Sequence, residues 1–218
     1  MKNILPIVVL STALIACNGK STETTTDSST EAVEATSSSF AYQRAFTKIT
    51  WTAYKTTAKI GVSGTFKDFE VSTQVESGSV TELLNGLNAN IAVTSVFSDN
   101  EERDGKLKSI FFGSMAETEA IVVDFKSVNG SDTAGTINMT VAMNGVSKEL
   151  AGNYTVENNK VIITSSLDLG DWDASSSVDA LNEACDDLHK GEDGVSKLWP
   201  TVDVTIESTL KEVSNENI

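Results

Sequence analysis

The chain has 218 residues, of which 16 are Lys or Arg and 31 are Asp or Glu, so its formal net charge at pH 7 is −15. This acidity disfavours binding to nucleic acid or to anionic lipid surfaces, because both attract basic proteins. The length suits one domain with an adequate core rather than two.

Residues 1–16 have the pattern of a lipoprotein signal peptide. Lys2 precedes an apolar run over residues 4–15, which is too short to span a membrane and ends in small residues suitable for cleavage. Cleavage there makes Cys17 the N-terminus. Acyl chains on its thiol would anchor the chain, since each buried methylene contributes about 0.8 kcal/mol. The alternative is an ordinary secretory signal, in which Cys17 has no special role.

Residues 17–44 predict a flexible tether that begins with the lipidated Cys17. Between Ser21 and Ser39, twelve of nineteen residues are Ser or Thr and none is basic or aromatic, a composition that cannot bury enough surface to fold. Asn18, and not an acid, follows the cysteine, which resembles the outer-membrane form of the sorting signal. We therefore expect a bacterial cell-envelope protein, anchored by lipid in the outer membrane, with its domain facing the periplasm or the cell surface.

Short runs of β-branched and aromatic residues with a period near two begin at residue 45, and they predict an antiparallel sheet in a domain of residues 45–212. Asn144-Gly145 and Glu157-Asn158-Asn159 suit tight turns, because Asn and Gly accept positive φ angles. Pro200 is expected at the entrance of the last strand, and residues 213–218 form a polar tail. Periodicity alone favours neither a sandwich nor a barrel. The nine expected strands lie near residues 48–54, 59–63, 69–76, 88–96, 120–128, 136–143, 148–155, 160–169 and 202–210.

Two helical insertions are expected between these strands. The first is a short polar helix or turn over Asp99–Leu107, with Asp99 as its N-cap. The second runs from a cap at Asp173 to Lys190, with His189 as a cation in its last turn. Its apolar stripe must cover a sheet face or a barrel mouth, and it consists of Val178, Leu181, Cys185 and Leu188.

Few residues offer catalytic chemistry. The chain has one histidine and, besides Cys17, one cysteine, and it has no glycine-rich phosphate loop and no nucleophile elbow. The acidic neighbours Asp186 and Asp187 disfavour a nucleophilic thiolate at Cys185, so we expect a packed helix residue there. We expect neither an enzyme nor a metal site, because the acidic cluster near the end of the chain fits no known ligand loop. That cluster consists of Asp171, Asp173, Asp186, Asp187, His189, Glu192 and Asp193.

Large apolar residues fall at inward-facing positions of the expected strands and insertions. They form either an ordinary core or the lining of a tunnel, because an eight-stranded barrel is just wide enough for side chains or for one small ligand. The set includes Trp51, Phe66, Phe69, Ile91, Phe97, Phe111, Phe112, Phe125, Met139, Met143 and Trp172.

Two segments resemble motifs of the YceI family of lipid-binding proteins. They are Gly64-Thr65-Phe66-Lys67-Asp68-Phe69 and, over residues 103–112, Arg-Asp-Gly-Lys-Leu-Lys-Ser-Ile-Phe-Phe. Residues 135–139 and 144–148 resemble that family's strand and turn before a Thr/Ser-Lys step, and Trp51 lies where its first strand carries a tryptophan. The similarity extends in order over about residues 46–210.

The resemblance implies an all-β fold with accessory helices: a lipocalin-like antiparallel barrel of eight strands, with one helix near residues 174–190. It implies a binding protein, without catalysis or a further cofactor, that encloses a polyisoprenoid, an isoprenoid quinone or a fatty-acyl lipid. Apart from the resemblance, Arg103, Lys106 and Lys108 form a basic patch in an acidic chain. We expect this patch, and Arg103 and Lys106 in particular, to meet the head group, unless Arg103 pairs with an acid in a solvated turn. The expected cavity residues are Trp51, Phe66, Phe69, Ile91, Phe97, Leu107, Phe111, Phe112, Phe125, Met139 and Met143.

The chain departs from the family at the polar end of this pocket. Residues 54–57 are Tyr-Lys-Thr-Thr where the family has a His-Ser pair, Lys106 replaces a histidine, and Ile110 replaces an acid. The identity of the head group therefore stays open.

Two other functions stay open as well. If the core is filled, the acidic body and its stalk would serve as an envelope interaction module with a protein partner. A carboxylate- or metal-dependent enzyme would be built on residues 171–193. The sequence does not indicate an oligomeric state.

Overall fold

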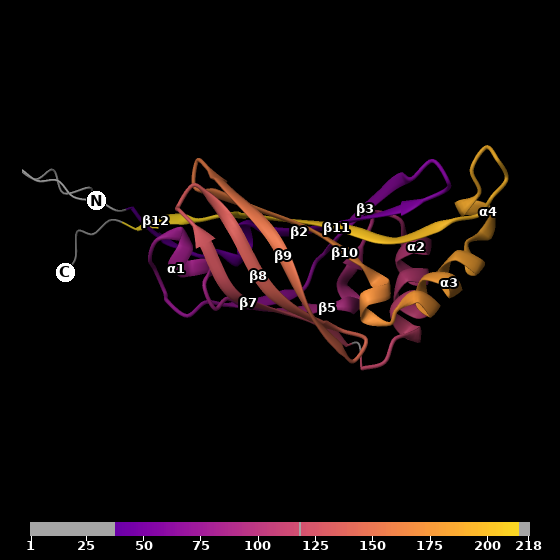
Figure 1. Cartoon of the computed structure of the whole chain (residues 1–218), viewed down its shortest axis with the longest axis horizontal. Helices are drawn as coiled ribbons and strands as arrows, with labels where there is room; N and C mark the ends of the chain where they lie inside the picture. Colours follow the sequence, from indigo (N-terminus) through magenta and orange to yellow (C-terminus); the bar gives the residue numbers. More distant parts are fainter. Residues whose placement is uncertain (1–37, 118, 214–218) are drawn as a thin grey trace, which may run out of the picture. The chain divides into compact units, whose positions relative to one another are not determined.

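Antiparallel strands dominate the computed structural model, which describes residues 38–117 and 119–213 (Figure 1). Ten of them form one sheet, in the order β4-β5-β7-β8-β9-β10-β11-β2-β3-β6, and β1 pairs with β12 separately. The strands are β1 Ser39–Ala41, β2 Thr47–Lys55, β3 Ile60–Phe66, β4 Phe69–Ser72, β5 Asn88–Ala92, β6 Val96–Phe97, β7 Ala120–Gly130, β8 Ala134–Met143, β9 Val146–Glu157, β10 Lys160–Asp168, β11 Leu198–Thr209 and β12 Lys211–Val213.

Short helices connect these strands. The α-helices are α1 Val80–Leu84, α2 Glu101–Lys106, α3 Ser175–Ala184 and α4 Asp186–His189. The other helical turns are η1 Arg44–Phe46, η2 Val93–Ser95, η3 Leu107–Phe111, η4 Phe112–Ser114 and η5 Leu169–Trp172, of which η3 is a π-helical turn.

Two bent strands, β3–β4 and β5–β6, each have one half at one end of the sheet and the other half at the opposite end. The sheet therefore curls. β3 and β4 are separated only by Lys67 and Asp68, and β5 and β6 only by η2. The Lys67 N–H donates to the Ser95 carbonyl, and the Ala92 N–H donates to the Asp68 carbonyl, both at 3.1 Å. When β3–β4 and β5–β6 are each counted as one bent strand, eight strands follow one another around the sheet. The expected all-β, lipocalin-like fold with accessory helices is confirmed.

Eight of the nine expected strands are present, although the one expected over residues 69–76 ends at Ser72, and the one expected over residues 88–96 is divided by η2 into β5 and β6. Both expected turns have the required backbone. Asn144 and Gly145 have φ angles of 53° and 69° between β8 and β9, and Asn158 and Asn159 have 50° and 63° between β9 and β10. Pro200 lies in β11 where the pairing with β2 shifts register, so its missing N–H interrupts no regular ladder. The helix α1 is not among the expected elements, although Ser79 and Glu82 form a reciprocal capping box at its start.

Both helical insertions differ from expectation at their ends. Asn100, and not Asp99, caps α2 by accepting a hydrogen bond from the Arg103 N–H, while Asp99 has a φ of 59°. Asp173 likewise has a left-handed backbone, with φ 54°, so it ends η5 and does not begin α3. The expected single helix up to Lys190 is interrupted at Cys185, which has φ −123° and separates α3 from α4.

The helix break changes which side chains are covered. Val178, Leu181 and Cys185 are buried as expected, but Leu188 is 58% exposed. Because α3 stops at Ala184, the residue one turn beyond Cys185 no longer follows the apolar stripe. No helix in the described part of the chain is long and apolar enough to cross a membrane.

The folded unit begins earlier than the expected tether boundary. Ser39–Ala41 of β1 pairs with Lys211–Val213 of β12, and Phe40 is buried. The Phe40 N–H and carbonyl each bond to Gly78, at 2.7 and 2.9 Å. The expected signal peptide, Cys17 and most of the tether lie outside the described residues.

Candidate ligand-binding cavity

Inward-facing side chains of the curled sheet leave an apolar cavity of about 130 Å³, which we call the main cavity. It lies toward the end of the sheet that α2 and α3 cover (Figure 1). Its wall contains aliphatic and aromatic side chains only: Trp51, Ala53, Phe66, Val96, Leu107, Phe111, Phe112, Ile121, Val141, Met143, Leu167, Leu169, Leu181, Leu198, Trp199, Val202 and Val204. The interior is therefore not completely filled by its own residues.

The indole of Trp51 packs onto the neighbouring strand because the residue opposite it there has no side chain. It pairs directly with Gly64 in the β2–β3 ladder. A Cβ added to Gly64 would lie 2.2 Å from Cζ2 of the indole, a distance that no side chain tolerates. The glycine in the first family-like motif thus sets the position of the tryptophan.

The helical segment after β6 contributes three residues to the wall. Leu107 begins the π-helical turn η3, Phe111 ends it, and Phe112 follows at once. The rings of Phe111 and Phe112 meet edge to face at 4.9 Å, and Phe112 lies 6.4 Å from the Phe66 ring of β3. Such π-helical turns insert one extra residue into a helix and are frequent at functional sites.

A second space of about 310 Å³, which we call the mouth pocket, adjoins the main cavity. The two share five wall residues: Trp51, Ala53, Leu107, Leu181 and Leu198. The other wall residues of the mouth pocket are largely polar: Tyr54, Lys55, Val62, Asn100, Glu102, Arg103, Lys106, Cys185, Leu188 and His189. An apolar chamber therefore opens into a polar one, which is the arrangement that an amphiphile requires.

Three cations face the mouth pocket, and one of them is unpaired. Lys55 donates to the Leu188 carbonyl at 2.8 Å, and Lys106 pairs with Glu102 at 2.9 Å. Arg103 is half-buried, and within residues 38–117 and 119–213 its guanidinium has neither an acidic partner nor a hydrogen bond. The alternative in which Arg103 is neutralised by an acid is not what the structure shows.

Two further polar groups border the mouth pocket. The Trp51 indole N–H is buried and has no hydrogen-bond partner among the described residues. His189 is buried, and its Nδ1 lies 2.9 Å from Asn182 Oδ1, which also accepts from the Ser196 hydroxyl. Burial, followed by the nearby Lys55 and Lys106, lowers the pKa of His189, so the residue is not the helix-end cation expected from the sequence.

A third space of about 60 Å³, which we call the rear cavity, lies toward the α1 end of the sheet. It shares no wall residue with the main cavity. Most of its wall is apolar and comes from α1 and the adjoining ends of the strands, including Leu83, Leu84, Ile49, Val123, Ile163 and Ile206.

The structure distributes the expected cavity residues over four environments. Ile91 and Phe125 line the rear cavity, and Phe69 and Met139 are buried but line neither cavity. The residues that line the main cavity are Trp51, Phe66, Leu107, Phe111, Phe112 and Met143. Phe97 differs from expectation. It is 38% exposed, because it follows the inward-facing Val96 on β6 and so points outward, beneath the Lys67 ammonium at 4.2 Å.

Sequence reasoning missed several wall residues on the last strand. Leu198 and Trp199 precede the expected strand, and Val202 and Val204 form part of it without having been singled out. The alternation of Val202, Val204 and Ile206 is the signal that would have identified one inward face. Trp199 offered no such signal, because it lies beside the register shift.

The acidic residues near the end of the chain do not converge. In the described ranges, no group of three or more His, Cys, Asp or Glu side chains is placed to hold a metal ion. Asp187 instead pairs with Lys190 at 2.9 Å, and Asp193 accepts a hydrogen bond from Thr57 at 2.7 Å.

Comparison with known proteins places this architecture in a family. The model of the YceI-like domain matches residues 25–210, which is most of the chain. The chain belongs to the YceI-like family. None of the curated proteins matches it.

Solved structures share the fold of this YceI-like chain. A polyisoprenoid-binding domain from Saccharophagus degradans is 12% identical, with a TM-score of 0.56 over 81% of this chain and 99% of its own. BcnA from Burkholderia cenocepacia is 9% identical, with a TM-score of 0.57 over 78% and 99%. The YceI protein of Campylobacter jejuni is 16% identical, with a TM-score of 0.51 over 71% and 86%.

Three residues at the departures that the sequence showed line the mouth pocket, whereas Ile110 lines neither this pocket nor the main cavity. Lys106, which replaces the family's histidine, and Tyr54 and Lys55, which stand in place of its His-Ser pair, are all wall residues.

Proposed function

We propose that this chain is a lipid-anchored, exported binding protein that sequesters a long amphiphile, with the tail in the main cavity and the head in the mouth pocket. The polyisoprenoid-binding domain of Saccharophagus degradans, which shares the fold, and membership of the YceI-like family support this proposal. Binding, rather than catalysis, is the function that an apolar wall offers.

One observation carries the proposal: the main cavity and the mouth pocket adjoin through Trp51, Ala53, Leu107, Leu181 and Leu198. The main cavity alone approaches the size of apolar cavities, about 150 Å³, that accept benzene. The mouth pocket brings the site into the range of about 300–1,000 Å³ that is usual for small-molecule sites. Each methylene that leaves water contributes about 0.8 kcal/mol to the binding free energy, so the gain grows with the length of the ligand's apolar chain.

The cations of the mouth pocket support an acidic head group. Arg103 presents a planar guanidinium that has no acidic partner in the described part of the chain, and its shape matches a carboxylate or a phosphate through two parallel hydrogen bonds. The buried indole N–H of Trp51 is a further donor, and leaving such a donor unpaired costs about 1–3 kcal/mol. A ligand oxygen at the boundary between the two spaces would pair with it.

The export and anchoring parts of the proposal rest on the sequence alone. The lipoprotein pattern of residues 1–16 and Cys17 supports attachment to the bacterial envelope. The net charge of −15 disfavours attachment through anionic lipid head groups, so acyl chains are the more suitable anchor.

The test is organic extraction of the full chain after purification from its own host, followed by mass spectrometry. We expect one amphiphile per protein. In Phe112→Asp we expect the lipid to be lost, because a carboxylate would enter an apolar wall. Phe46→Asp is the matched control and should retain the lipid, because Phe46 is 61% exposed and lines none of the three spaces described above.

A second variant guards against a folding defect. Val204→Phe narrows the main cavity without adding a charge, and in the folded protein it should reduce the extracted lipid. A wild-type protein that yields no lipid contradicts the proposal, and so does a folded Phe112→Asp protein that keeps a full complement.

A further inference from the structure

The main and rear cavities are two chambers of one barrel interior. On β2 the inward residues Trp51 and Ile49 are neighbours along one face, and Trp51 lines the main cavity while Ile49 lines the rear cavity. On β11 the same holds for Val204 and Ile206. Successive inward residues are about 7 Å apart along a strand, so little more than one layer of side chains separates the chambers.

Phe69 belongs to that layer. Along the bent strand β3–β4, Phe66 lines the main cavity, Val71 lines the rear cavity, and the buried Phe69 between them lines neither. Its partner across the sheet is Ile91, whose side chain also points into the interior.

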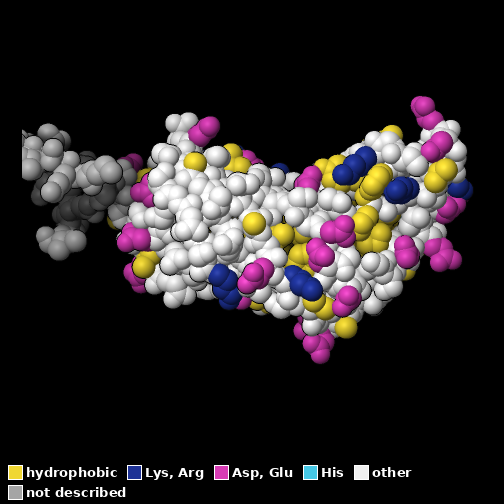
Figure 2. All heavy atoms as spheres, in the orientation of Figure 1, with side chains coloured by type: hydrophobic (Ala, Val, Ile, Leu, Met, Phe, Trp, Pro, Cys, Tyr) yellow, Lys and Arg dark blue, Asp and Glu magenta, His cyan; other side chains and the backbone are white. Residues whose placement is uncertain are grey.

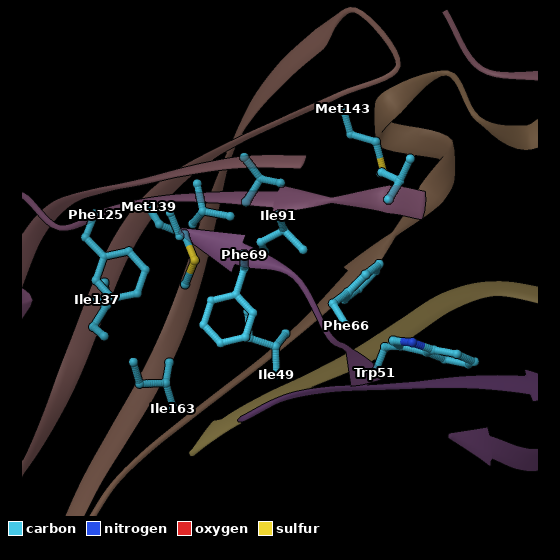
Figure 3. Packing of buried hydrophobic residues seen from close by; sticks show 14 of the residues in the cluster. Ile49, Trp51, Phe66, Phe69, Ile91, Phe125, Ile137, Met139, Met143 and Ile163 are labelled. Carbon is cyan, nitrogen blue, oxygen red and sulfur yellow. The ribbon is translucent and has the colours of Figure 1, made fainter. Parts of the chain in front are cut away.

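Met139 of β8 lies at a corresponding level of the interior. On β8, Val141 and Met143 line the main cavity, whereas Met139, the next inward residue, is buried and lines neither chamber. Its partner Phe125 on β7 lines the rear cavity. Figure 3 shows Phe69 in the middle of the interior, with Trp51, Phe66 and Met143 on one side and Phe125, Ile137 and Ile163 on the other.

The position of Phe69 is fixed from outside the barrel. The Arg44 Nε donates to the Phe69 carbonyl at 2.8 Å, and the guanidinium lies 4.6 Å from the centre of the phenyl ring. Met139 is packed beside Gly152, where an added Cβ would lie 2.9 Å from the Met139 methyl group. Phe69 is therefore held at its backbone and covered on one face of its ring.

We infer that Phe69 and Met139 form a partition that ends the ligand cavity and so limits the length of the apolar tail this chain can hold. The inference rests on the proposed function and deepens it, since it concerns which amphiphiles fit. A tail that enters through the mouth pocket stops at the partition, and the rear cavity remains beyond its reach.

Removing the partition should join the chambers. In Phe69→Ala the space of the phenyl ring would connect the main cavity with the rear cavity. A crystal structure of this variant under xenon pressure should show gas in the space vacated by the ring, between the two chambers. If the strands collapse into that space and the chambers stay separate, the inference is overturned.

The functional test is the dependence of affinity on tail length. The full chain is loaded with a fluorescent fatty-acid analogue, which is displaced by straight-chain fatty acids from octanoate to icosanoate. In the wild type, each methylene should raise affinity about fourfold until the tail reaches the partition, after which the gain stops. In Phe69→Ala the gain should continue to longer acids.

Two more variants complete the design. Met139→Ala opens the partition at its other residue and should also lengthen the preferred tail, which keeps the test valid if Phe69→Ala does not fold. Ile163→Ala enlarges the rear cavity but leaves both partition residues in place, so its length limit should equal that of the wild type.

The outcomes separate the inference from the proposed function. If every variant binds acids with the same length limit as the wild type, the partition is wrong while the binding function stands. If no acid displaces the probe from the wild type or from any variant, the proposed function fails, and the partition fails with it.

Discussion

Arg103 is a basic residue in an acidic chain, and it lines the mouth pocket. The chain carries almost two acids for each basic residue, yet this guanidinium has no acidic partner within residues 38–117 and 119–213 and faces the mouth pocket. A ligand that carries a negative charge into this pocket would give the guanidinium a counter-ion. The neighbouring Lys55 and Lys106 would add to the attraction.

Replacing this guanidinium should discriminate between head groups. We expect Arg103→Gln to lower affinity for a fatty acid about tenfold, equivalent to about 1.4 kcal/mol, because one charge-assisted hydrogen bond is lost. Affinity for the alcohol of the same chain length should change little, since its head is neutral. Titration calorimetry with both ligands, at low and high salt, measures the difference.

Lys108→Gln supplies the control for that experiment. Lys108 is an exposed cation on the same helical segment, but it does not line the mouth pocket. Its removal should therefore leave acid and alcohol affinities almost unchanged. Equal losses in the two variants would mean that only the general charge of the segment matters, and not a bond from Arg103.

For single residues, the sequence predicted which residue types line the cavity better than it predicted where each side chain points. Trp51, Phe66 and Phe112 were expected in the wall and lie there, because aromatic residues on alternating strands are usually buried. Phe97 was placed on the same grounds, but β6 has only two residues, and so short a strand offers no alternation to read. Gly64 belonged to a quoted motif, yet its role became visible only when the indole of Trp51 was seen to occupy the space of its missing Cβ.

Among the elements, the covering helices carry both the hydrophobic wall and the polar rim. Figure 2 shows exposed hydrophobic side chains, with Lys and Arg side chains beside them, on the part of the face where Figure 1 has β3 and β11 in front of these helices. The exposed Leu188 on α4 and the paired Lys55 belong to the wall of the mouth pocket. The interruption at Cys185 turns α4 away from the line of α3 and places Leu188 at this rim.

The α3–α4 segment should weaken in mild acid because of His189. Burial lowers the pKa of this histidine in the folded state, whereas the unfolded value is about 6.5. The stabilisation is therefore fully present above pH about 6.5 and is lost as the pH falls toward the folded value, because the unfolded chain binds the proton more readily. Urea denaturation between about pH 7.5 and 5 should show a fall in the free energy of unfolding.

In His189→Gln this fall should become shallower, because no imidazole remains to titrate. The comparison is clean, since His189 is the only histidine of the chain and the carboxylates titrate mainly at lower pH. Parallel curves for the wild type and the variant would show that another group causes the acid sensitivity.

Element boundaries depended on local backbone that the sequence did not reveal. Asp99 and Asp173 are good N-cap types, but both adopt a left-handed backbone here, and Asn100 caps α2 instead. The π-helical turn at Leu107–Phe111 has no sequence signature, because it depends on how the aromatic pair packs against the sheet. The Asn-Gly turn was predictable, since its positive φ angles follow from the residues themselves.

For the molecule as a whole, periodicity predicted the antiparallel sheet, but curling depended on contacts distant in sequence. The two ends of the sheet are joined by hydrogen bonds between the segment around Lys67 and Asp68 and the residues Ala92 and Ser95. No local sequence pattern predicts that pairing. The cavities likewise follow from the sum of side-chain volumes on eight strands, which a list of apolar positions does not give. The family resemblance supplied this level of the prediction.

The proposed anchor and the binding site should be separable. We expect the wild-type chain in its host to sediment with membranes and Cys17→Ser to be released into the soluble fraction, because the serine cannot carry the thioether-linked acyl chains. The purified variant should bind lipid as the wild type does, since every residue of the main cavity and the mouth pocket lies between Trp51 and Val204. Ser28→Ala, a change in the expected tether, is the control and should stay with the membranes. If Cys17→Ser remains in the membrane fraction after a salt wash, lipid on that cysteine is not what holds the protein there.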